Sequence, residues 1–202
     1  MITITQDPAL DRLVSFEQDS WPLEEQATTG QLSARKEQFG EGIFLLSDNG
    51  KDVAQFTLAP KSFSLESIEG FVQMRDVPVD YGSRSLWGIN LACPAKYQGK
   101  GYSIRLVVHA FRWATDVGYE SFTAGLTLYG LSRKIAQGKV KDAQDFHRKG
   151  MNCVVKVFRR SAAILNAQFS CGEPIAEYWP EDLDSLGYGV VVSIVFKEGV
   201  LA

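Results

Sequence analysis

The sequence predicts one α/β domain built on a mixed β-sheet. Segments with the two-residue period of strands alternate with segments of helical period along the 202 residues. An Asn49-Gly50 pair between two β-rich runs is the strongest short-range signal for a hairpin. The chain contains neither an internal repeat nor a low-complexity tract, and its length suits a single domain with a sizeable core.

The composition is typical of soluble globular proteins, with 45% hydrophobic and 22% charged residues. A net charge of −3 gives no reason to expect nucleic-acid binding. No apolar run approaches the roughly 18 residues of a membrane span, and the first residues lack the basic and apolar regions of a secretion signal. We therefore expect a cytoplasmic protein with no membrane and no nucleic-acid partner.

The metal-binding residue types are few and poorly spaced. The cysteines Cys93, Cys153 and Cys171 are odd in number and form no CxxC pair, and the histidines are limited to His109 and His147. This pattern indicates neither a disulfide framework nor a zinc site, so no metal is expected.

The first third of the chain predicts a strand, two helices and a hairpin. Alternation predicts a strand over 2–5, and an Asp-Pro start with helical spacing predicts a helix over 7–16. Thr28 or Thr29 can cap a second helix that runs to residue 38. The hairpin strands are residues 42–47 and 52–60.

Residues 61–84 form a long connection, which in a compact domain is usually functional. A buried strand is then expected over 85–93, followed by the best-defined helix of the chain over 103–117. A short strand over 120–124 and a weaker helix over 142–149 come next.

The rest of the chain is rich in β-branched residues. Cys153 to Phe158 (CVVKVF) and Tyr188 to Phe196 (YGVVVSIVF) read as strands, and the stretch 159–186 between them is atypical. The predicted order is therefore β, α, α, β, β, β, α, β, α, β, β.

One glycine-rich turn, KYQGKGYS over residues 96–103, lies between the 85–93 strand and the 103–117 helix. Glycine allows close backbone approach to a ligand, and a helix start offers unpaired N–H groups, so such a turn suits a phosphate. It is not a P-loop, because Lys100 precedes Gly101. Nor is it a dinucleotide fingerprint, because Ile104 occupies the third glycine position. Spacing alone leaves an ordinary turn and an anion site both open.

The segment 86–124 resembles the central motif of the GNAT superfamily of N-acetyltransferases, Gln/Arg-x-x-Gly-x-Gly/Ala after the fourth strand. Here the motif reads Gln98-Gly99-Lys100-Gly101-Tyr102-Ser103, with Pro94 and Tyr97 upstream; Ser103 departs mildly from the pattern. Residues 142–151 also resemble a late element of that family, Ala-x-x-Phe-Tyr-x-x-x-Gly-Phe, with one residue fewer.

The resemblance implies a GNAT fold over residues 1–202 as a single domain, with a mixed, mostly antiparallel sheet of about seven strands flanked by helices. It implies coenzyme A, as acetyl-CoA, bound at the turn and along the fourth strand. The implied cofactor-binding residues are Leu91, Ala92, Cys93, Gln98, Gly99, Lys100, Gly101, Tyr102 and Ser103. Whether Lys100 contacts a phosphate or only solvent is left open.

The implied activity is transfer of an acetyl group from acetyl-CoA to an amine of a small molecule or peptide by direct attack, and homodimers are common among similar proteins. Three alternatives stand beside it. The first is a catalytically weak sensor of coenzyme A or acyl-CoA, and the second is an acyltransferase for longer acyl chains. The third is an interaction protein whose turn is purely structural.

The catalytic residues are unassigned. The family's tyrosine acid would fall at Phe146, which cannot donate a proton, and the neighbouring His147 points elsewhere on a helix. The family's strand glutamate is replaced by Asn90. The remaining acid–base candidates are Tyr129, Asp76, Asp80 and Tyr178.

Cys93 invites a covalent mechanism, but a buried structural cysteine is the favoured interpretation, and His109 is expected in or beside the core. The acceptor pocket is expected from residues 20–40, the 61–84 connection and the 159–186 stretch. Whether the acidic residues there attract a cationic amine or only face solvent is left open; they are Asp76, Asp80, Glu181 and Asp182.

Overall fold

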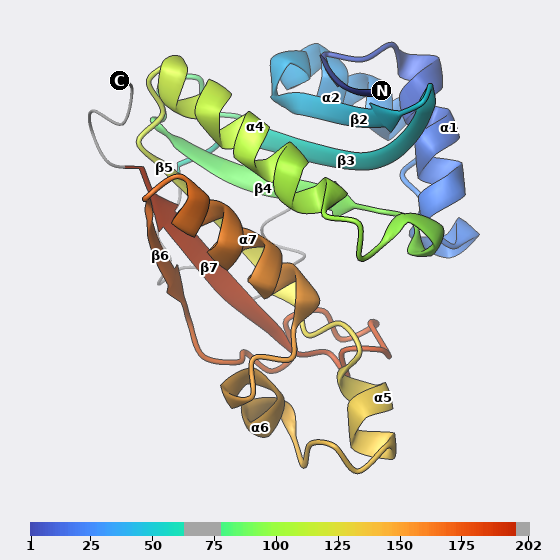
Figure 1. The fold of residues 1–202 in the computed structure, drawn as a ribbon, viewed down its shortest axis with the longest axis vertical. Coiled ribbons are helices and arrows are strands. Elements are labelled where there is room, and N and C mark those ends of the chain that lie inside the picture. Colours follow the sequence, from blue (N-terminus) through green and yellow to red (C-terminus); the bar gives the residue numbers. More distant parts are fainter. Residues whose placement is uncertain (63–77, 197–202) are drawn as a thin grey trace.

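A computed structural model describes residues 1–62 and 78–196 (Figure 1). One seven-stranded sheet with the order β1-β2-β3-β4-β5-β7-β6 organises the chain. All its neighbours pair antiparallel except β4 and β5, which are parallel. The strands are β1 (Ile2–Gln6), β2 (Ile43–Asp48), β3 (Lys51–Pro60), β4 (Ser85–Ala92), β5 (Ser121–Thr127), β6 (Gln168–Cys171) and β7 (Gly189–Val195). The mixed, mostly antiparallel sheet confirms the predicted fold class.

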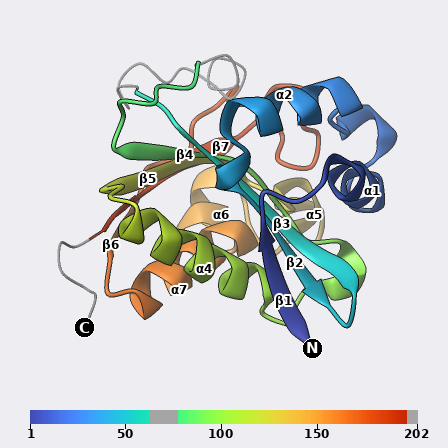
Figure 2. The ribbon, with the colours of Figure 1, turned by 90° about the horizontal axis from the view of Figure 1, so that it is seen from above.

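Helices cover both faces of the sheet: α4 and α7 lie on one face, and α1 and α2 lie on the other (Figure 2). The α-helices are α1 (Leu10–Ser20), α2 (Thr29–Phe39), α4 (Tyr102–Asp116), α5 (Leu131–Ala136), α6 (Ala143–Arg148) and α7 (Cys153–Ile164). Short 3₁₀ helices are η1 (Leu23–Glu25), η2 (Gly40–Gly42) and η4 (Ala95–Tyr97). Within the described ranges, none of these helices is long and apolar enough to cross a membrane.

The main core lies between the sheet and the α4–α7 layer. Phe111 of α4 packs on Phe122 of β5 with ring centroids 4.8 Å apart, and Phe158 of α7 packs on the same ring at 5.1 Å. Phe56 of β3 meets all three of these rings. Burying such side chains stabilises the fold by about 1.5–3 kcal/mol each, so these aromatic contacts fix how both helices lie on the sheet.

Short-range sequence signals predict the hairpin and the helix cap of the N-terminal half correctly. Asn49 and Gly50 both have positive φ, 50° and 78°, as a two-residue hairpin turn requires. Thr28 caps α2, accepting a hydrogen bond from the Gln31 N–H at 3.2 Å while the Gln31 side chain accepts one from the Thr28 N–H at 2.8 Å. The predicted hairpin and cap are therefore confirmed.

The predicted strand over 153–158 is wrong, because these residues begin helix α7. The Asn152 side chain accepts hydrogen bonds from the Val154 and Val155 N–H groups at 2.9 and 3.3 Å, which starts the helix. Val155, Phe158 and Ala162 then share one buried helical face. Packing on α4 therefore outweighs the strand preference of the valines.

The predicted order also omitted two elements. Strand β6 lies in the stretch 159–186 and pairs with β7 from Gln168 to Cys171. Helix α5 follows β5, which itself extends to Thr127 rather than ending at Ala124. Both omitted elements are short, and six or fewer residues carry little periodic signal.

A buried carboxylate organises α6. Asp145, with a side chain only 7% exposed, accepts hydrogen bonds from Arg148 at 2.9 Å and Lys149 at 2.8 Å, and from the Lys141 N–H at 3.1 Å. The bond from Lys149, and then that from Arg148, hold the pKa of Asp145 well below its usual range.

This depressed pKa predicts an acid-dependent stability. The contribution of Asp145 is present above the unfolded-state pKa of about 3.9 and is lost as the pH falls through the lower folded-state pKa. Asp145→Asn should destabilise the protein near pH 7, and its deficit relative to the wild type should shrink below about pH 4. Urea unfolding of both proteins from pH 7 to pH 3 measures this, and a pH-independent deficit would contradict it.

Candidate functional site

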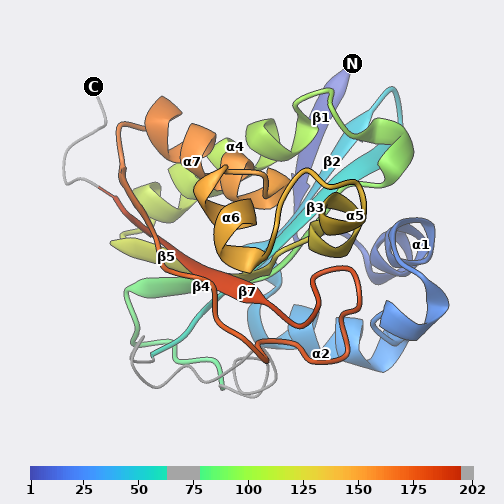
Figure 3. The same ribbon diagram turned by 90° about the horizontal axis from the view of Figure 1, so that it is seen from below.

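The sheet splits open between β4 and β5. The ends of β4 and β5 lie side by side in Figure 3. The two strands share only three pairs, Ser85–Ser121, Leu86–Phe122 and Trp87–Thr123, although both strands continue beyond them. The register of β4 on β3 shifts at the same level, from Leu58–Gly88 to Thr57–Asn90, so Ile89 is an extra residue. A bulge of this kind bends a strand and increases its twist. Past Trp87, β4 therefore turns an unpaired edge toward the split.

The Phe122 ring closes the split on the α4 side, at the end next to the three β4–β5 pairs. We call this the closed end of the split. A Cβ on Gly88 would lie 2.8 Å from Cζ of Phe122 and 3.0 Å from Cβ of Ala124. Only glycine leaves room for the Phe122 ring at this position.

The predicted phosphate turn follows the open end of the split. Leu91 and Ala92 are the last two residues of β4, and Cys93 comes directly after them. The Gln98 amide donates a hydrogen bond to the Cys93 carbonyl oxygen at 3.0 Å, which closes the turn on itself. The nine residues predicted to bind the cofactor thus form one continuous strand–turn–helix path.

The start of α4 has the properties of an anion site. Gly101 precedes the helix with φ of 80°, and no side chain among the described residues caps the first turn. The first N–H groups of this 15-residue helix therefore have no partner within it, and they lie at its positive dipole end.

Backbone conformation is the reason for the two glycines. Gly99 and Gly101 have φ of 79° and 80°, which other residues adopt only with strain. A Cβ added at either would meet no atom of residues 1–62 and 78–196 within 4 Å, so these residues leave space beside the turn. The turn therefore has both the conformation and the room that a phosphate group needs.

Neighbouring side chains fix the turn in place. The Tyr102 hydroxyl donates a hydrogen bond to Asp48 at 2.6 Å, joining α4 to the β2–β3 hairpin. The ammonium groups of Lys96 and Lys100 lie 5.2 and 5.7 Å from the centre of the Tyr97 ring. Lys96 is also paired with Asp19 at 3.1 Å. Lys100 has no carboxylate partner in the described part of the chain, which leaves its charge available.

Burial raises the pKa of the Cys93 thiol, and the nearby Ser103 hydroxyl offsets part of that increase. The thiolate is the reactive form of cysteine, so Cys93 is poorly suited to covalent catalysis.

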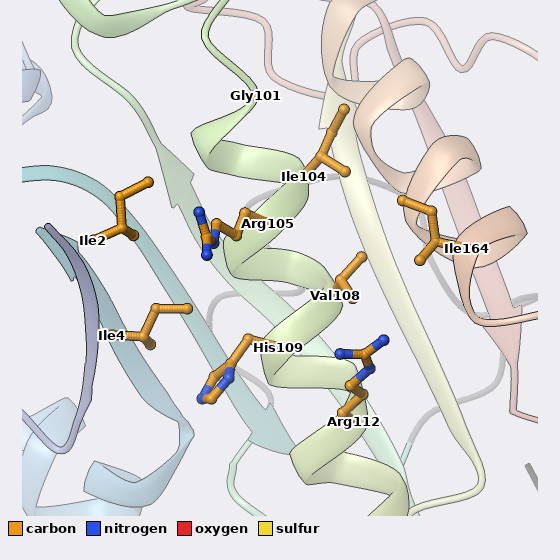
Figure 4. Close-up of a pocket in the computed structure, with 9 residues that line it drawn as sticks. All are labelled: Ile2, Ile4, Gly101, Ile104, Arg105, Val108, His109, Arg112 and Ile164. Atoms are coloured by element: carbon orange, nitrogen blue, oxygen red, sulfur yellow. The ribbon is translucent and has the colours of Figure 1, made fainter. Parts of the chain in front are cut away.

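A groove of about 610 Å³ runs along the outer side of α4, starting at Gly101 (Figure 4). Its apolar walls come from β1, α4 and the end of α7, and its cationic side chains come from α4. It is lined by Ile2, Ile4, Gly101, Ile104, Arg105, Val108, His109, Arg112 and Ile164. Neither Arg105 nor Arg112 pairs with a carboxylate in residues 1–62 and 78–196. Burial, and then the charge of Arg112, lower the pKa of His109, whose ring meets Phe44 at 5.9 Å.

The acid–base candidates are scattered, and Asp76 lies outside the described residues. Phe146 is buried in the main core, and His147 beside it is half-buried on α6. Tyr129 is 49% exposed and lies under the Arg133 guanidinium at 5.8 Å. Asp80 accepts hydrogen bonds from Ser62 and the Gly82 N–H, and these lower its pKa.

Asn90, which replaces the family's glutamate, and one acid–base candidate, Tyr178, lie beside the split. Asn90 is on β4 next to the bulge, opposite Thr57. Tyr178 is fully buried with Trp87 of β4, and this burial raises the pKa of its hydroxyl, which therefore stays protonated.

A polar row crosses the α1 side of the sheet near the bulge. Gln55 and Thr57 are both buried, and the Gln55 amide donates a hydrogen bond to the Thr57 hydroxyl at 3.2 Å. The Gln55 carbonyl oxygen is buried and accepts no hydrogen bond from the residues that the structure describes. Such an acceptor is costly to bury unless a donor reaches it. No group of three or more His, Cys, Asp or Glu side chains suited to a metal lies in the described ranges.

The sequence analysis did not predict which side chains close the split between β4 and β5. Gly88 and Gly125 lie inside strands and Gly189 begins one, and glycine in a strand often marks the close approach of another group. The rings of Phe122 and Tyr178 are those groups. The glycines were therefore a usable signal, although they do not name the residues that pack on them.

The turn predicts opposite effects for two glycine substitutions. Gly101→Ala should destabilise the protein by about 1 kcal/mol, because alanine is strained at positive φ. Gly30→Ala should be neutral or stabilise by about 0.5 kcal/mol, because Gly30 is exposed in helix α2 with free space around it. Chemical denaturation measures both changes, and a neutral Gly101→Ala would contradict the described turn.

Neither a protein-family model nor a curated protein sequence matches the chain. Solved structures do match. A GNAT-like decarboxylase, GphF, in complex with isobutyryl-CoA superposes with a TM-score of 0.78 at 19% identity, over 98% of this chain and 100% of the other.

The loading GNATL domain of CurA from Lyngbya majuscula has a TM-score of 0.70 at 14% identity, over 96% and 98% of the two chains. The ribosomal-protein-S18-alanine N-acetyltransferase from Escherichia coli has a TM-score of 0.60 at 14% identity, over 98% and 97%. These similarities extend over nearly the whole of each chain, and the protein has the GNAT fold.

Proposed function

We propose that the protein is an N-acetyltransferase that moves an acetyl group from acetyl-CoA to an amine of a small molecule or peptide. The observation that carries this proposal is the uncapped start of α4, with free space beside Gly99 and Gly101, at the open end of the β4–β5 split. The shared fold of solved structures described with isobutyryl-CoA or coenzyme A supports it.

In this proposal the N–H groups of residues 98–103 bind the pyrophosphate. Lys100 adds a positive charge, and Arg105 extends it along the groove that begins at Gly101. The unpaired edge of β4 from Leu91 to Cys93 binds the extended pantetheine arm and polarises the thioester carbonyl through a main-chain N–H.

The reaction needs a neutral amine, whose nitrogen forms a bond to the carbonyl carbon. The carbon–sulfur bond breaks, coenzyme A leaves as the thiol, and the amine loses a proton. We propose that the Gln55 carbonyl oxygen, which is buried on the α1 side of the sheet and has no donor among the described residues, accepts a hydrogen bond from an N–H of the acceptor substrate. Of the acid–base candidates, Tyr178 is the one beside the split, and the amide of Asn90 can donate or accept a hydrogen bond there but cannot act as the acid or the base.

The neighbour described with isobutyryl-CoA favours one alternative, an acyl group other than acetyl. Calorimetric competition between acetyl-CoA and longer acyl-CoA thioesters separates this alternative from the acetyl proposal. Binding without turnover on a broad panel of amines would instead indicate a sensor. Homodimers and a cytoplasmic location remain part of the proposal.

The phosphate turn is tested by Gly101→Glu, which places a carboxylate where the pyrophosphate is proposed to bind. Calorimetry should show acetyl-CoA affinity weakened by about 100-fold or more, because two like charges brought together cost several kcal/mol. Gly118→Glu is the matched control, since Gly118 follows the far end of α4 with φ of 96° and free space around it. Unchanged affinity in Gly101→Glu, or no acetyl-CoA binding by the wild type, would refute the proposal.

Direct transfer predicts that Cys93 stays unmodified. Incubation with acetyl-CoA and no amine should leave the intact mass unchanged, because burial keeps the Cys93 thiol protonated. Tryptic mass spectrometry checks the residue itself, with the exposed Cys153 as an internal comparison. An acetyl thioester on the Cys93 peptide alone would instead indicate a covalent intermediate.

A further inference from the structure

Tyr178 lies flat on two glycines beside the split. A Cβ on Gly125 would fall 1.3 Å from the Tyr178 hydroxyl oxygen, and one on Gly189 would fall 2.2 Å from Cδ1 of its ring. The ring therefore occupies the space of two missing side chains, one on β5 and one on β7. Any other residue at either glycine would displace it.

The position of the hydroxyl is set by strand register. Gly125 is two residues past Thr123, the last residue of β5 that pairs with β4. If the register of the three pairs is continued, Gly125 lies level with Ile89, the bulge residue of β4. Tyr178 is thus at the closed end of the split.

The Phe122 and Tyr178 rings, which both close the split, lie on opposite faces of the sheet. Phe122 belongs to the main core between the sheet and the α4–α7 layer. Side chains alternate along a strand, so residue 125 points to the other face, where Tyr178 lies. The closed end of the split is therefore bounded by an aromatic ring on each side.

The loop that carries Tyr178 is tied to the sheet and to itself. Ile175 and Gly189 exchange two backbone hydrogen bonds at 2.8 and 3.0 Å, and the Trp179 N–H donates to the Gly187 carbonyl at 3.2 Å. Asp184 of the same loop accepts a hydrogen bond from the Gly130 N–H at 2.7 Å. Tyr178 forms a buried cluster with Trp87, and Ile89, Ile175 and Trp179 pack against this cluster. Tyr178 is therefore a rigid wall rather than a mobile cover.

We infer that Tyr178 is the specificity-determining residue that limits the acyl group to short chains, no longer than butyryl. This inference rests on the proposed function, which places the thioester near Leu91 to Cys93. Leu91 follows Ile89 by two residues along β4, which is a distance of about 7 Å. That length leaves room for the thioester and a short acyl group before the chain meets the Tyr178 ring.

Tyr178→Ala tests the wall by removing the ring. Calorimetric affinities are measured for coenzyme A and for its acetyl, butyryl, isobutyryl, hexanoyl and octanoyl thioesters, so no acceptor substrate is required. The wild type should bind the thioesters up to butyryl well. It should bind hexanoyl-CoA about tenfold or more weakly, because hexanoyl has two methylenes more than butyryl and a filled pocket discriminates by about tenfold or more even against one. Tyr178→Ala should recover hexanoyl-CoA and octanoyl-CoA binding and leave free coenzyme A unaffected.

Two further variants keep the test decisive. Tyr178→Phe retains the ring and should keep the wild-type chain-length profile, which separates the wall from any role of the hydroxyl. Tyr178→Leu makes a smaller cavity and should show the same shift to a lesser extent if the alanine variant does not fold. Tight octanoyl-CoA binding by the wild type, or an unshifted profile in both cavity variants, overturns the wall but not the proposed function. No affinity for any of these thioesters overturns both.

Discussion

The incomplete pairing of β4 with β5 is the constraint on which the rest of the structure depends. Parallel strands must be joined by a crossover, and here the crossover is the turn at 96–103 followed by α4. Such a connection leaves from the carboxyl end of β4, which is also where the strands have separated. The uncapped start of α4 and the unpaired edge of β4 therefore occur at the same place. The proposed phosphate and pantetheine contacts follow from this one topological fact.

The two faces of the sheet differ in the side chains that they bury beside the split. On the α4–α7 face, packed aromatic rings form the main core, and the Phe122 ring closes the split from that face. On the α1 side, Ile43 and Leu45 of the apolar clusters lie opposite Thr57 and Gln55, and the Gln55 carbonyl oxygen has no hydrogen-bond donor within residues 1–62 and 78–196. A buried polar group without a partner lowers stability, so the fold tolerates a cost there that a purely structural sheet would avoid. The aromatic core therefore lies on one side of the split, and the polar pair of Gln55 and Thr57 lies on the other.

Sequence predicts the local part of this arrangement well. The Asn49-Gly50 turn, the Thr28 cap and the amphipathic α4 each depend on residues close together in the chain, and each is found as expected. Helix α7 was misread because its valines favour strands, whereas its existence depends on the Asn152 cap and on contacts with α4, nearly fifty positions earlier. The packing of Tyr178 on Gly125 joins residues on different elements, and no local pattern encodes such a contact. The strand–turn–helix arrangement at 96–103 was predictable for the same reason as the hairpin, whereas the packing of Tyr178 was not.

The unpaired edge of β4 has one more consequence. Exposed strand edges invite other chains to add to a sheet, and proteins usually shield them at the periphery. Here β4 is the fourth strand of seven, so its free edge is inside the sheet, with β5 facing it across the split. Another protein strand has no access to pair along its length, but a thin, extended molecule with amide groups can do so. The pantetheine arm is such a molecule, and it would complete the sheet as a short substitute strand, recognised by its backbone-like amides rather than by side chains.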